Sequence, residues 1–261
     1  MIYKEFLPAP ALQDKVECYW QFIIPPCPSN NHDPIPHVVI PHGCPELIFI
    51  KNLAIKQNFI AIKGPSTSKF NIDIYPDTLY VGIRIKPGQL KWFAGISEAD
   101  LLNQHQLCPE SSWQTWQQQI MASISSGMNI EELFGNSLLN QETEPQYQAD
   151  PRINRIVNRI ISDQGKTEPA TLACLAFLSL RQLQRIFKKE TGMSLKQFSQ
   201  IRKLRHAILQ LYFKQQNQQE MIVDHNYVDL SHFYKSFRNI AQYKLDDFFK
   251  YIDQIDHQQM V

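Results

Sequence analysis

The stretch from Ser179 to Gly192, SLRQLQRIFKKETG, carries the side chains of this chain that are best suited to recognition chemistry. If the stretch is helical, one side of it collects polar and basic groups, which are Arg181, Gln182, Gln184, Arg185 and Lys188. Arg can hydrogen-bond O6 and N7 of guanine together, and Gln can bond N6 and N7 of adenine together. The pattern predicts a helix that reads base edges in a DNA major groove, and a solvated basic face is the alternative.

Local signals favour such a helix and orient it. Ser179 is a suitable N-cap residue, and Gly192 suits the left-handed conformation that commonly follows a helix. Leu183, Ile186 and Phe187 recur at the i, i+3 and i+4 positions, so they form one apolar face. We therefore expect a helix over residues 179–190 that buries this face and turns its basic face outward.

Two helix-turn-helix units are expected around this segment. A short apolar helix over residues 172–177 precedes it, with a tight step at Leu178-Ser179. A second pair follows, with a short helix over 219–225, a turn at Asn226-Tyr227 and a helix over 229–239. The second helix would bury Phe233 and Phe237 and would present Ser231, Tyr234, Lys235 and Arg238.

A long amphipathic segment, Leu195 to Phe213, separates the two units. As a helix, its 19 residues span about 28 Å at a rise of about 1.5 Å per residue. Neighbouring major-groove sites on one side of DNA lie about 34 Å apart, so this helix could hold two reading helices near one turn apart. Arg202, Lys203 and Arg205 on it are candidates for phosphate contacts, and a solvated face is an equal alternative for each.

Two stretches resemble the DNA-binding domain of AraC/XylS-type transcription regulators, over roughly residues 150–252. They are LACLAFLSLRQLQRIFKKETGMSLKQF and VDLSHFYKSFR. The matching positions of the first half are Ala173, Ser179, Leu183, Arg185, Phe187, Lys188, Gly192 and Ser194. The resemblance implies double-stranded promoter DNA as a partner and RNA polymerase as a possible further one. It puts base contacts on Arg181, Gln184 and Arg185, then on Ser231, Tyr234 and Lys235, with Lys188 and Arg238 toward phosphate.

The second unit departs from the family pattern. Asn226-Tyr227 stands where the family has Gly-Phe at the turn, although Asn tolerates the left-handed conformation. Ile222 replaces a small Ala, and the closing Gly-x-x-Pro and Arg are replaced by Gln242, Leu245 and Phe249. These changes bear on DNA affinity more than on fold. The alternative is a protein-interaction or small-ligand-binding module whose second unit has lost DNA binding.

The charge of the chain is divided between its two halves. Residues 1–150 contain 9 Lys/Arg and 15 Asp/Glu, so this half is acidic. Residues 151–261 contain 17 Lys/Arg and 10 Asp/Glu, so this half is basic. Phosphate contacts supply most of the nonspecific affinity for DNA, so the basic half is the one expected to bind it. A length of 261 residues suggests two domains. We expect an N-terminal domain over 1–140, a polar linker over 141–150 and the DNA-binding domain over 151–255.

The N-terminal domain is predicted to be β-rich. Short apolar or alternating runs bounded by Pro and Gly favour a small barrel or sandwich, and they are 16–24, 37–40, 46–50, 59–62, 69–75 and 78–85. Residues of about 97–140 look helical, with helices over 97–103, from Ser111 or Ser112 to Ile124, and over 130–139. These helices would cover the barrel, and a homodimer interface is the alternative. The expected fold class is α+β with two domains, the second all-α.

Two N-terminal stretches, VIPHGCPELIF and GIRIKPGQLKWFAG, also resemble a family. They are similar to the small domain that precedes the DNA-binding domain in a subset of AraC-type regulators, with a Pro-x-Gly-Cys and a Lys-Pro-Gly motif. The tripeptide at 41–43 is Pro-His-Gly here, where Pro-Asp-Gly is usual. The resemblance implies a domain for sensing or assembly, with a small-molecule effector as a candidate ligand.

Other chemistry has little support in the sequence. His37, His42, Cys44 and Glu46 could hold a metal, but the Pro and Gly residues around them favour a turn, so no metal or cofactor is expected. Nucleophile-elbow, phosphate-loop and H-E-x-x-H motifs are absent, and no enzyme is predicted. Five cysteines without C-x-x-C spacing favour a reducing compartment. With no signal core or apolar span, we expect a cytoplasmic protein.

Overall fold

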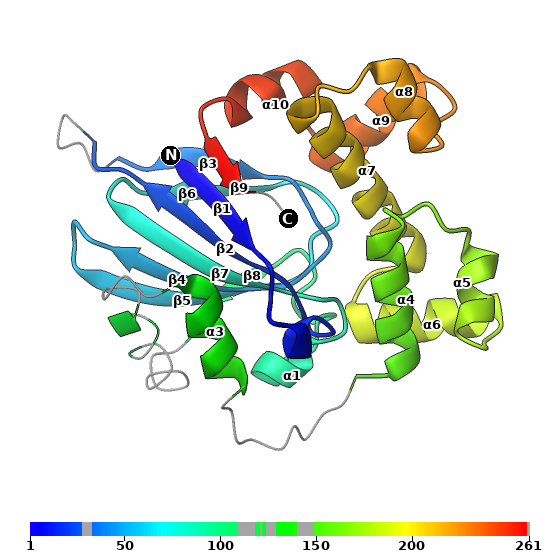
Figure 1. Cartoon of the computed structure of the whole chain (residues 1–261), viewed down its shortest axis with the longest axis horizontal. Coiled ribbons are helices and arrows are strands. Elements are labelled where there is room, and N and C mark those ends of the chain that lie inside the picture. Colours follow the sequence, from blue (N-terminus) through cyan, green and yellow to red (C-terminus); the bar gives the residue numbers. More distant parts are fainter. Residues whose placement is uncertain are drawn as a thin grey trace.

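The computed structural model describes residues 1–27, 33–108, 118, 120, 122–123, 129–139 and 149–259. A β-rich N-terminal part lies beside an all-helical C-terminal part, as Figure 1 shows. The α+β fold with two domains of different class is therefore confirmed.

The strands form two sheets. The larger has the order β8-β5-β4-β7-β2-β1-β9, and β3 pairs with β6 in a second sheet. The bounds in the larger sheet are β1 (Ile2–Phe6), β2 (Val16–Ile24), β4 (Glu46–Asn52), β5 (Gln57–Lys63), β7 (Thr78–Ile85), β8 (His105–Leu107) and β9 (Asp256–Gln259). Strands β3 (Ile35–Val39) and β6 (Phe70–Ile74) are paired antiparallel. Among the described residues the sheets do not join into a closed barrel, so the sandwich-like alternative holds.

The large sheet has two different faces because side chains alternate along each strand. Tyr19, Phe49, Val81 and Ile83 are fully buried on one face. They pack in a cluster with residues of η1 (Pro10–Leu12), α1 (Leu90–Ala94) and α3 (Ile130–Leu139). The other face turns toward β3 and β6, with Trp20, Phe22 and Tyr80 in a cluster with Ile74. One face is thus a packed core, and the opposite face is the wall of an interior space.

The helical region after β7 differs in part from the expectation. Residues 97–103 form turns rather than a helix. The physical reason is the buried Glu98 carboxyl group, whose Oε1 accepts the Gly88 and Leu90 N–H groups at 2.7 and 3.1 Å and so holds the segment against α1. Helix α3 is confirmed, with Asn129 accepting the Glu131 N–H. The helix expected from Ser111 or Ser112 and most of the linker 141–150 lie outside the described residues.

The C-terminal part is built around its longest helix. The helices are α4 (Pro151–Ser162), α5 (Pro169–Leu175), α6 (Leu180–Thr191), α7 (Leu195–Phe213), α8 (Gln218–Asp224), α9 (Leu230–Ala241) and α10 (Leu245–Ile252). One apolar cluster joins α4, α5 and α6 to the first half of α7, and a second joins α8, α9 and α10 to its second half. Helix α7 has the predicted bounds. None of the described helices has the length and apolarity needed to cross a bilayer.

The end of the chain returns to its beginning. Strand β9 pairs in parallel with β1, with Ile2 opposite Asp256 and Tyr3 opposite His257. This strand follows α10 directly, so it ties the second helix-turn-helix unit to the edge of the N-terminal sheet (Figure 1).

Candidate nucleic-acid interface

Helix α6 is held firmly at both ends. Ser179 Oγ accepts the Gln182 N–H at 3.3 Å, and Gln182 Oε1 accepts the Ser179 N–H at 3.0 Å, which together form a capping box. Gly192 ends the helix at φ 73°, where a Cβ atom would lie 2.9 Å from the Glu98 carbonyl oxygen. Close packing and positive φ both require glycine here. The reading helix therefore has a defined position in its domain.

The outer face of α6 presents the side chains predicted for DNA contact. Arg181, Gln184, Arg185 and Lys188 are all exposed, while Leu183 and Phe187 on the opposite face are fully buried. Gln182 is also exposed, but its Oε1 is engaged in the capping box. The structure thus brings four of the five predicted residues together as exposed polar groups and gives Gln182 a structural role.

Helix α9 repeats this arrangement in the second unit. Asp229 Oδ1 accepts the His232 N–H at 2.7 Å and caps the helix. Phe233 and Phe237 are buried. The exposed side chains include the four that the sequence predicted, Ser231, Tyr234, Lys235 and Arg238. The turn before the helix also forms, because Asn226 adopts a left-handed φ of 51°.

The three cations of α7 suggested for phosphate contacts each have a partner within the chain, and Arg202 is buried. Arg202 Nη2 lies 2.5 Å from Glu17 Oε1, and its Nη1 donates to the His42 carbonyl at 3.3 Å. Arg205 Nη2 donates to Glu5 Oε1 at 3.2 Å. Lys203 Nζ donates to the Asn226 carbonyl at 2.8 Å. These cations hold α7 against the N-terminal sheet and against the second turn.

The Arg202–Glu17 pair is an electrostatic tie between the two domains. Burial opposes ionisation of Glu17, but the guanidinium groups of Arg202 and Arg84 hold the pKa of its carboxyl well below the usual range. Burial also opposes the charge of Arg202, yet the Glu17 carboxylate raises the pKa of Arg202 above its ordinary value. Both partners are therefore ionised, and separating them would leave buried charges without compensation.

The Pro-His-Gly-Cys motif at 41–44 takes part in the same interdomain contact. Gly43 has φ 78°, and a Cβ atom there would lie 2.7 Å from the Phe198 ring of α7. Cys44 belongs to the apolar cluster of the first unit, and its Sγ donates to Glu17 Oε2 at 2.9 Å. The motif is therefore the surface on which α7 docks, a role that sequence reasoning missed.

The four residues considered for a metal do not converge. His42 Nε2 lies 3.2 Å from Glu46 Oε1, whereas Cys44 turns toward Glu17. His37 is hydrogen-bonded to the Tyr251 hydroxyl of α10. Within the part of the chain that the structure describes, no cluster of three or more His, Cys, Asp or Glu side chains is arranged to hold a metal ion.

Solved structures of ToxT from Vibrio cholerae share a distant similarity with the chain. The P21 crystal form has 10% identity and a TM-score of 0.47, covering 89% of this chain and 96% of that one. Unsaturated-fatty-acid-bound wild-type ToxT of strain SCE256 has 8% identity and a TM-score of 0.45, covering 88% and 93%. ToxT of strain O395 bound to (E)-4-(8-methylnaphthalen-1-yl)but-3-enoic acid has 8% identity and a TM-score of 0.48, covering 96% of this chain and 99% of that one. Identities this low transfer no residue role to this chain.

Two domain families match separate parts of the sequence. Residues 4–106 match a family described as a domain of unknown function (DUF6597), and residues 172–250 match one described as a helix-turn-helix domain. No curated protein matches the chain significantly. The second match covers both units built by α5–α6 and α8–α9. The chain therefore carries a helix-turn-helix DNA-binding domain of the type found in AraC-family transcription regulators, behind an N-terminal domain of the DUF6597 family.

Proposed function

We propose that the protein is a sequence-specific transcription regulator of the AraC/XylS type that binds promoter DNA in the cytoplasm through α6 and α9. The observation that carries this proposal is the face of α6, where Arg181, Gln184, Arg185 and Lys188 are exposed together on a capped helix. Two arginines and a glutamine can read base edges, and the lysine can meet a phosphate.

The second part of the proposal is that both units read adjacent major grooves. Helix α7 joins the two apolar clusters, and its 19 residues extend about 28 Å. That length is close to the roughly 34 Å between successive groove sites on one side of the duplex. One chain would thus contact two half-sites, with Ser231, Tyr234, Lys235 and Arg238 of α9 on the second.

Regulation would pass through the contacts that hold α7. Glu17 and Glu5 of the N-terminal sheet pair with Arg202 and Arg205, and β9 attaches the region after α10 to β1. A ligand or partner that favours one arrangement of these domains would shift the population that fits DNA. An effector, RNA polymerase and a second copy of the chain are the partners that we expect to act in this way.

Selection of bound duplexes from a random pool tests the proposal directly. A site with two half-sites about one helical turn apart is expected if both units bind. Gln184→Ala should reduce discrimination at one base pair, whereas Lys188→Gln should weaken all sequences alike and reduce the salt slope by about 1. Lys56→Gln, which removes an exposed cation from the N-terminal domain, is the matched control. Failure to enrich any sequence would refute the proposal.

A second candidate function is favoured by the charge of the second unit. Residues 218–241 contain two cations and three carboxylates, a poor balance for binding a polyanion. The protein would then be an interaction or small-ligand-binding module in which α9 no longer contacts DNA. Selection of a DNA site with only one half-site, by both the wild type and Lys235→Ala, would support this alternative over binding to two half-sites.

A further inference from the structure

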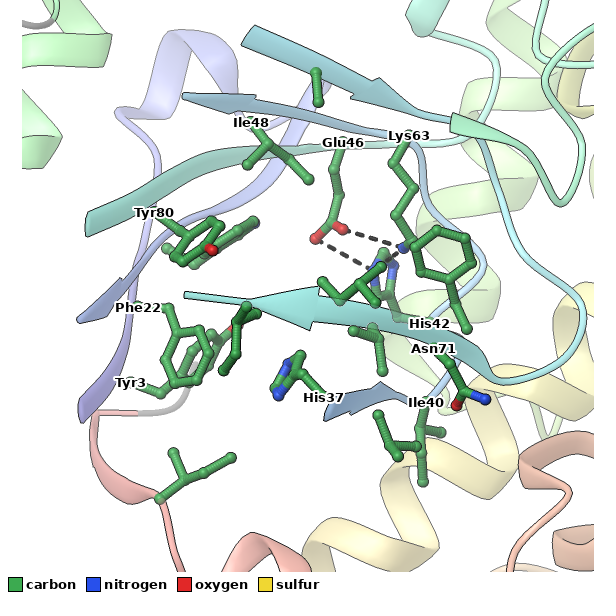
Figure 2. Close-up of a pocket in the computed structure, with 18 of the residues that line it drawn as sticks. Tyr3, Phe22, His37, Ile40, His42, Glu46, Ile48, Lys63, Asn71 and Tyr80 are labelled. Carbon is green, nitrogen blue, oxygen red and sulfur yellow. Dashed lines mark hydrogen bonds and ion pairs between the residues drawn. The ribbon is translucent and has the colours of Figure 1, made fainter. Parts of the chain in front are cut away.

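A partly open cavity of about 870 Å³ lies where the two domains meet. The large sheet forms one wall, β3 and β6 form another, and residues of α7, α10 and β9 line a third side. Figure 2 shows Tyr3, Phe22, Ile48 and Tyr80 facing the space between the sheets. The volume falls within the range of about 300–1,000 Å³ found for small-molecule sites. The cavity therefore belongs to both domains and is not contained in the N-terminal one.

Most of the cavity wall is apolar. Every second residue of the central strands points into it, including Trp20 and Phe22 of β2, Ile48 and Ile50 of β4, and Tyr80 of β7. Ile208 of α7 and Phe248 of α10 extend the same surface from the helical domain. An apolar, partly aromatic space of this size favours a ligand with a large apolar body.

The charged side chains that the large sheet contributes to the cavity lie in one row that crosses the sheet. Glu5, Arg84, Glu46 and Lys63 stand on β1, β7, β4 and β5, so negative and positive groups alternate along the row. Arg84 pairs with Glu5 at 2.7 Å and with Glu46 at 3.3 Å, and Lys63 pairs with Glu46 at 3.1 Å. The row is nearly fully buried and its charges balance. Figure 2 shows the Glu46 end of it beside His42.

His42 adds no charge to this row. It lies 3.2 Å from Glu46 Oε1 and 3.4 Å from Lys63 Nζ. Burial, together with the neighbouring Lys63, lowers the pKa of His42 to about 3 against the opposing effect of Glu46. The imidazole is thus neutral near neutral pH.

Arg205 of α7 brings a positive charge that the row does not balance. Its Nη2 reaches Glu5 Oε1 at 3.2 Å, but the same oxygen accepts Arg84 Nη1 at 2.7 Å and the Tyr3 hydroxyl at 2.9 Å. The bond to Arg205 is the longest of the three. The remaining acidic side chain along the cavity is Asp73 on β6, which is exposed to solvent. A cation that shares one crowded oxygen beside an apolar space is well placed to receive an anion.

Two further groups in the wall are without hydrogen-bond partners among the described residues. They are the indole Nε1 of Trp20 and both ring nitrogens of His257, all buried. His257 packs against Tyr3 at a centroid distance of 5.8 Å, and Trp20 stacks on Tyr3 at 6.2 Å. Buried polar atoms in native proteins nearly always have partners, so these atoms point to polar atoms of a bound molecule.

We propose that the cavity binds a molecule with an elongated apolar body and a single anionic head, and that the head pairs with Arg205 while the body lies between the two sheets. The head would compete with Glu5 for the guanidinium group. Because Arg205 stands on the helix between the two recognition helices, occupancy would alter the contact that holds α7 against the sheet. Only this regulatory consequence rests on the proposed function.

The test compares three probes that share one tail and differ in the head, each used below its micelle concentration. Dodecanoate, dodecanol and dodecylamine are titrated into the full chain by calorimetry, without DNA. Dodecanoate should bind saturably with one site and at least tenfold more tightly than the other two. Equal affinity for all three, or no saturable binding of dodecanoate, would overturn the proposal.

Variants locate the site. Arg205→Gln should reduce the affinity for dodecanoate to that for dodecanol, while Lys196→Gln, which removes an exposed cation from the same helix, should bind as the wild type does. Ile50→Trp keeps Arg205 and fills the apolar part of the cavity, so it should weaken dodecanoate and dodecanol alike. If Arg205→Gln does not fold, Ile50→Trp still tests whether the ligand lies in this cavity. Binding to folded Ile50→Trp at wild-type strength would place the ligand elsewhere and refute the assignment.

A final arm separates this inference from the proposed function. Dodecanoate should change the affinity of the wild-type chain for its selected DNA and should have no effect on the DNA affinity of Arg205→Gln. A chain that selects DNA but binds no dodecanoate would refute the ligand site alone. A chain that binds dodecanoate through Arg205 but selects no DNA would refute the regulator alone.

Discussion

The two helix-turn-helix units are alike in construction. Helices α6 and α9 each have twelve residues, a side-chain cap at the start and two buried aromatic or aliphatic anchors one turn apart. In both units, the residue that ends the preceding helix is fully buried, Ala176 in the first and His225 in the second. A left-handed residue follows in each, Phe177 at φ 55° and Asn226 at φ 51°.

The charges on the exposed surfaces of the two units differ much more than their helices and buried residues do. Residues 169–191 contain four cations and one carboxylate, whereas residues 218–241 contain two cations and three carboxylates. Burial and capping constrain the inner face of each unit, but nothing in the packing constrains the exposed face. The comparison teaches that the same helical packing can carry exposed faces of opposite net charge.

The largest expected effect is on stability and concerns the buried aromatic residues that the two units share. Phe187→Ala and Phe237→Ala should each lower the free energy of unfolding by about 3–5 kcal/mol, because both rings are fully buried in a cluster around α7. Urea denaturation followed by circular dichroism measures both. A loss below about 1 kcal/mol at Phe237 alone would show that the second unit is packed less well than the first.

The next effect concerns DNA affinity. Arg185→Ala should lower the affinity for the selected site by about 1–3 kcal/mol, since it removes a candidate bidentate base contact. Lys235→Ala, at the corresponding place on α9, should cost less than half of that because its unit is acidic overall. Fluorescence anisotropy at two salt concentrations compares the variants. Equal losses would contradict the unequal roles of the two units.

The helix ends provide an opposed pair of substitutions. Gly192→Ala should destabilise the chain by about 1–2 kcal/mol, because a Cβ atom meets the Glu98 carbonyl at a positive φ. Gln242, which ends α9, holds φ 48° without being glycine. Gln242→Gly should therefore stabilise the second unit by about 0.5 kcal/mol. Thermal unfolding would show shifts of opposite sign, and two shifts of the same sign would exclude this account.

Acid should loosen the second unit before the first. His206 Nδ1 and His225 Nε2 lie 2.9 Å apart between α7 and α8, and Ala176 occupies the matching buried place in the first unit. Burial lowers the pKa of His206 to about 4, helped by His225 and by Lys166, and burial also lowers the pKa of His225. The unfolded chain therefore binds protons at higher pH than the folded chain does. Stability is full above about pH 6.5 and falls as the pH drops toward 4.

Hydrogen exchange of α6 and α9 at pH 7 and pH 5 measures this difference. Protection of α9 should fall by about 1 kcal/mol relative to α6, allowing for solvent around the half-buried His206. His206→Gln should remove most of the difference. Equal loss of protection in both helices, or no change in His206→Gln, would assign the acid sensitivity to other groups.

Local patterns in the sequence were enough to predict the bounds of elements whose stabilising contacts are local. Alternation located β2 and β7 to the residue, and apolar periodicity located α7. The expected helix over 97–103 failed because the buried Glu98 bonds backbone groups of another segment. Strands β8 and β9 were missed because each is short and is stabilised by pairing with a distant strand.

The sequence by itself determined which helices carry Arg, Gln and Lys on one face, because helical spacing and capping act over a few residues. Only the tertiary structure decided what the cations of α7 contact. Arg202 and Glu17 lie 185 positions apart, and Arg205 and Glu5 lie 200 positions apart. No local pattern links such residues, because their proximity depends on how the two domains pack. The same packing creates the cavity between them.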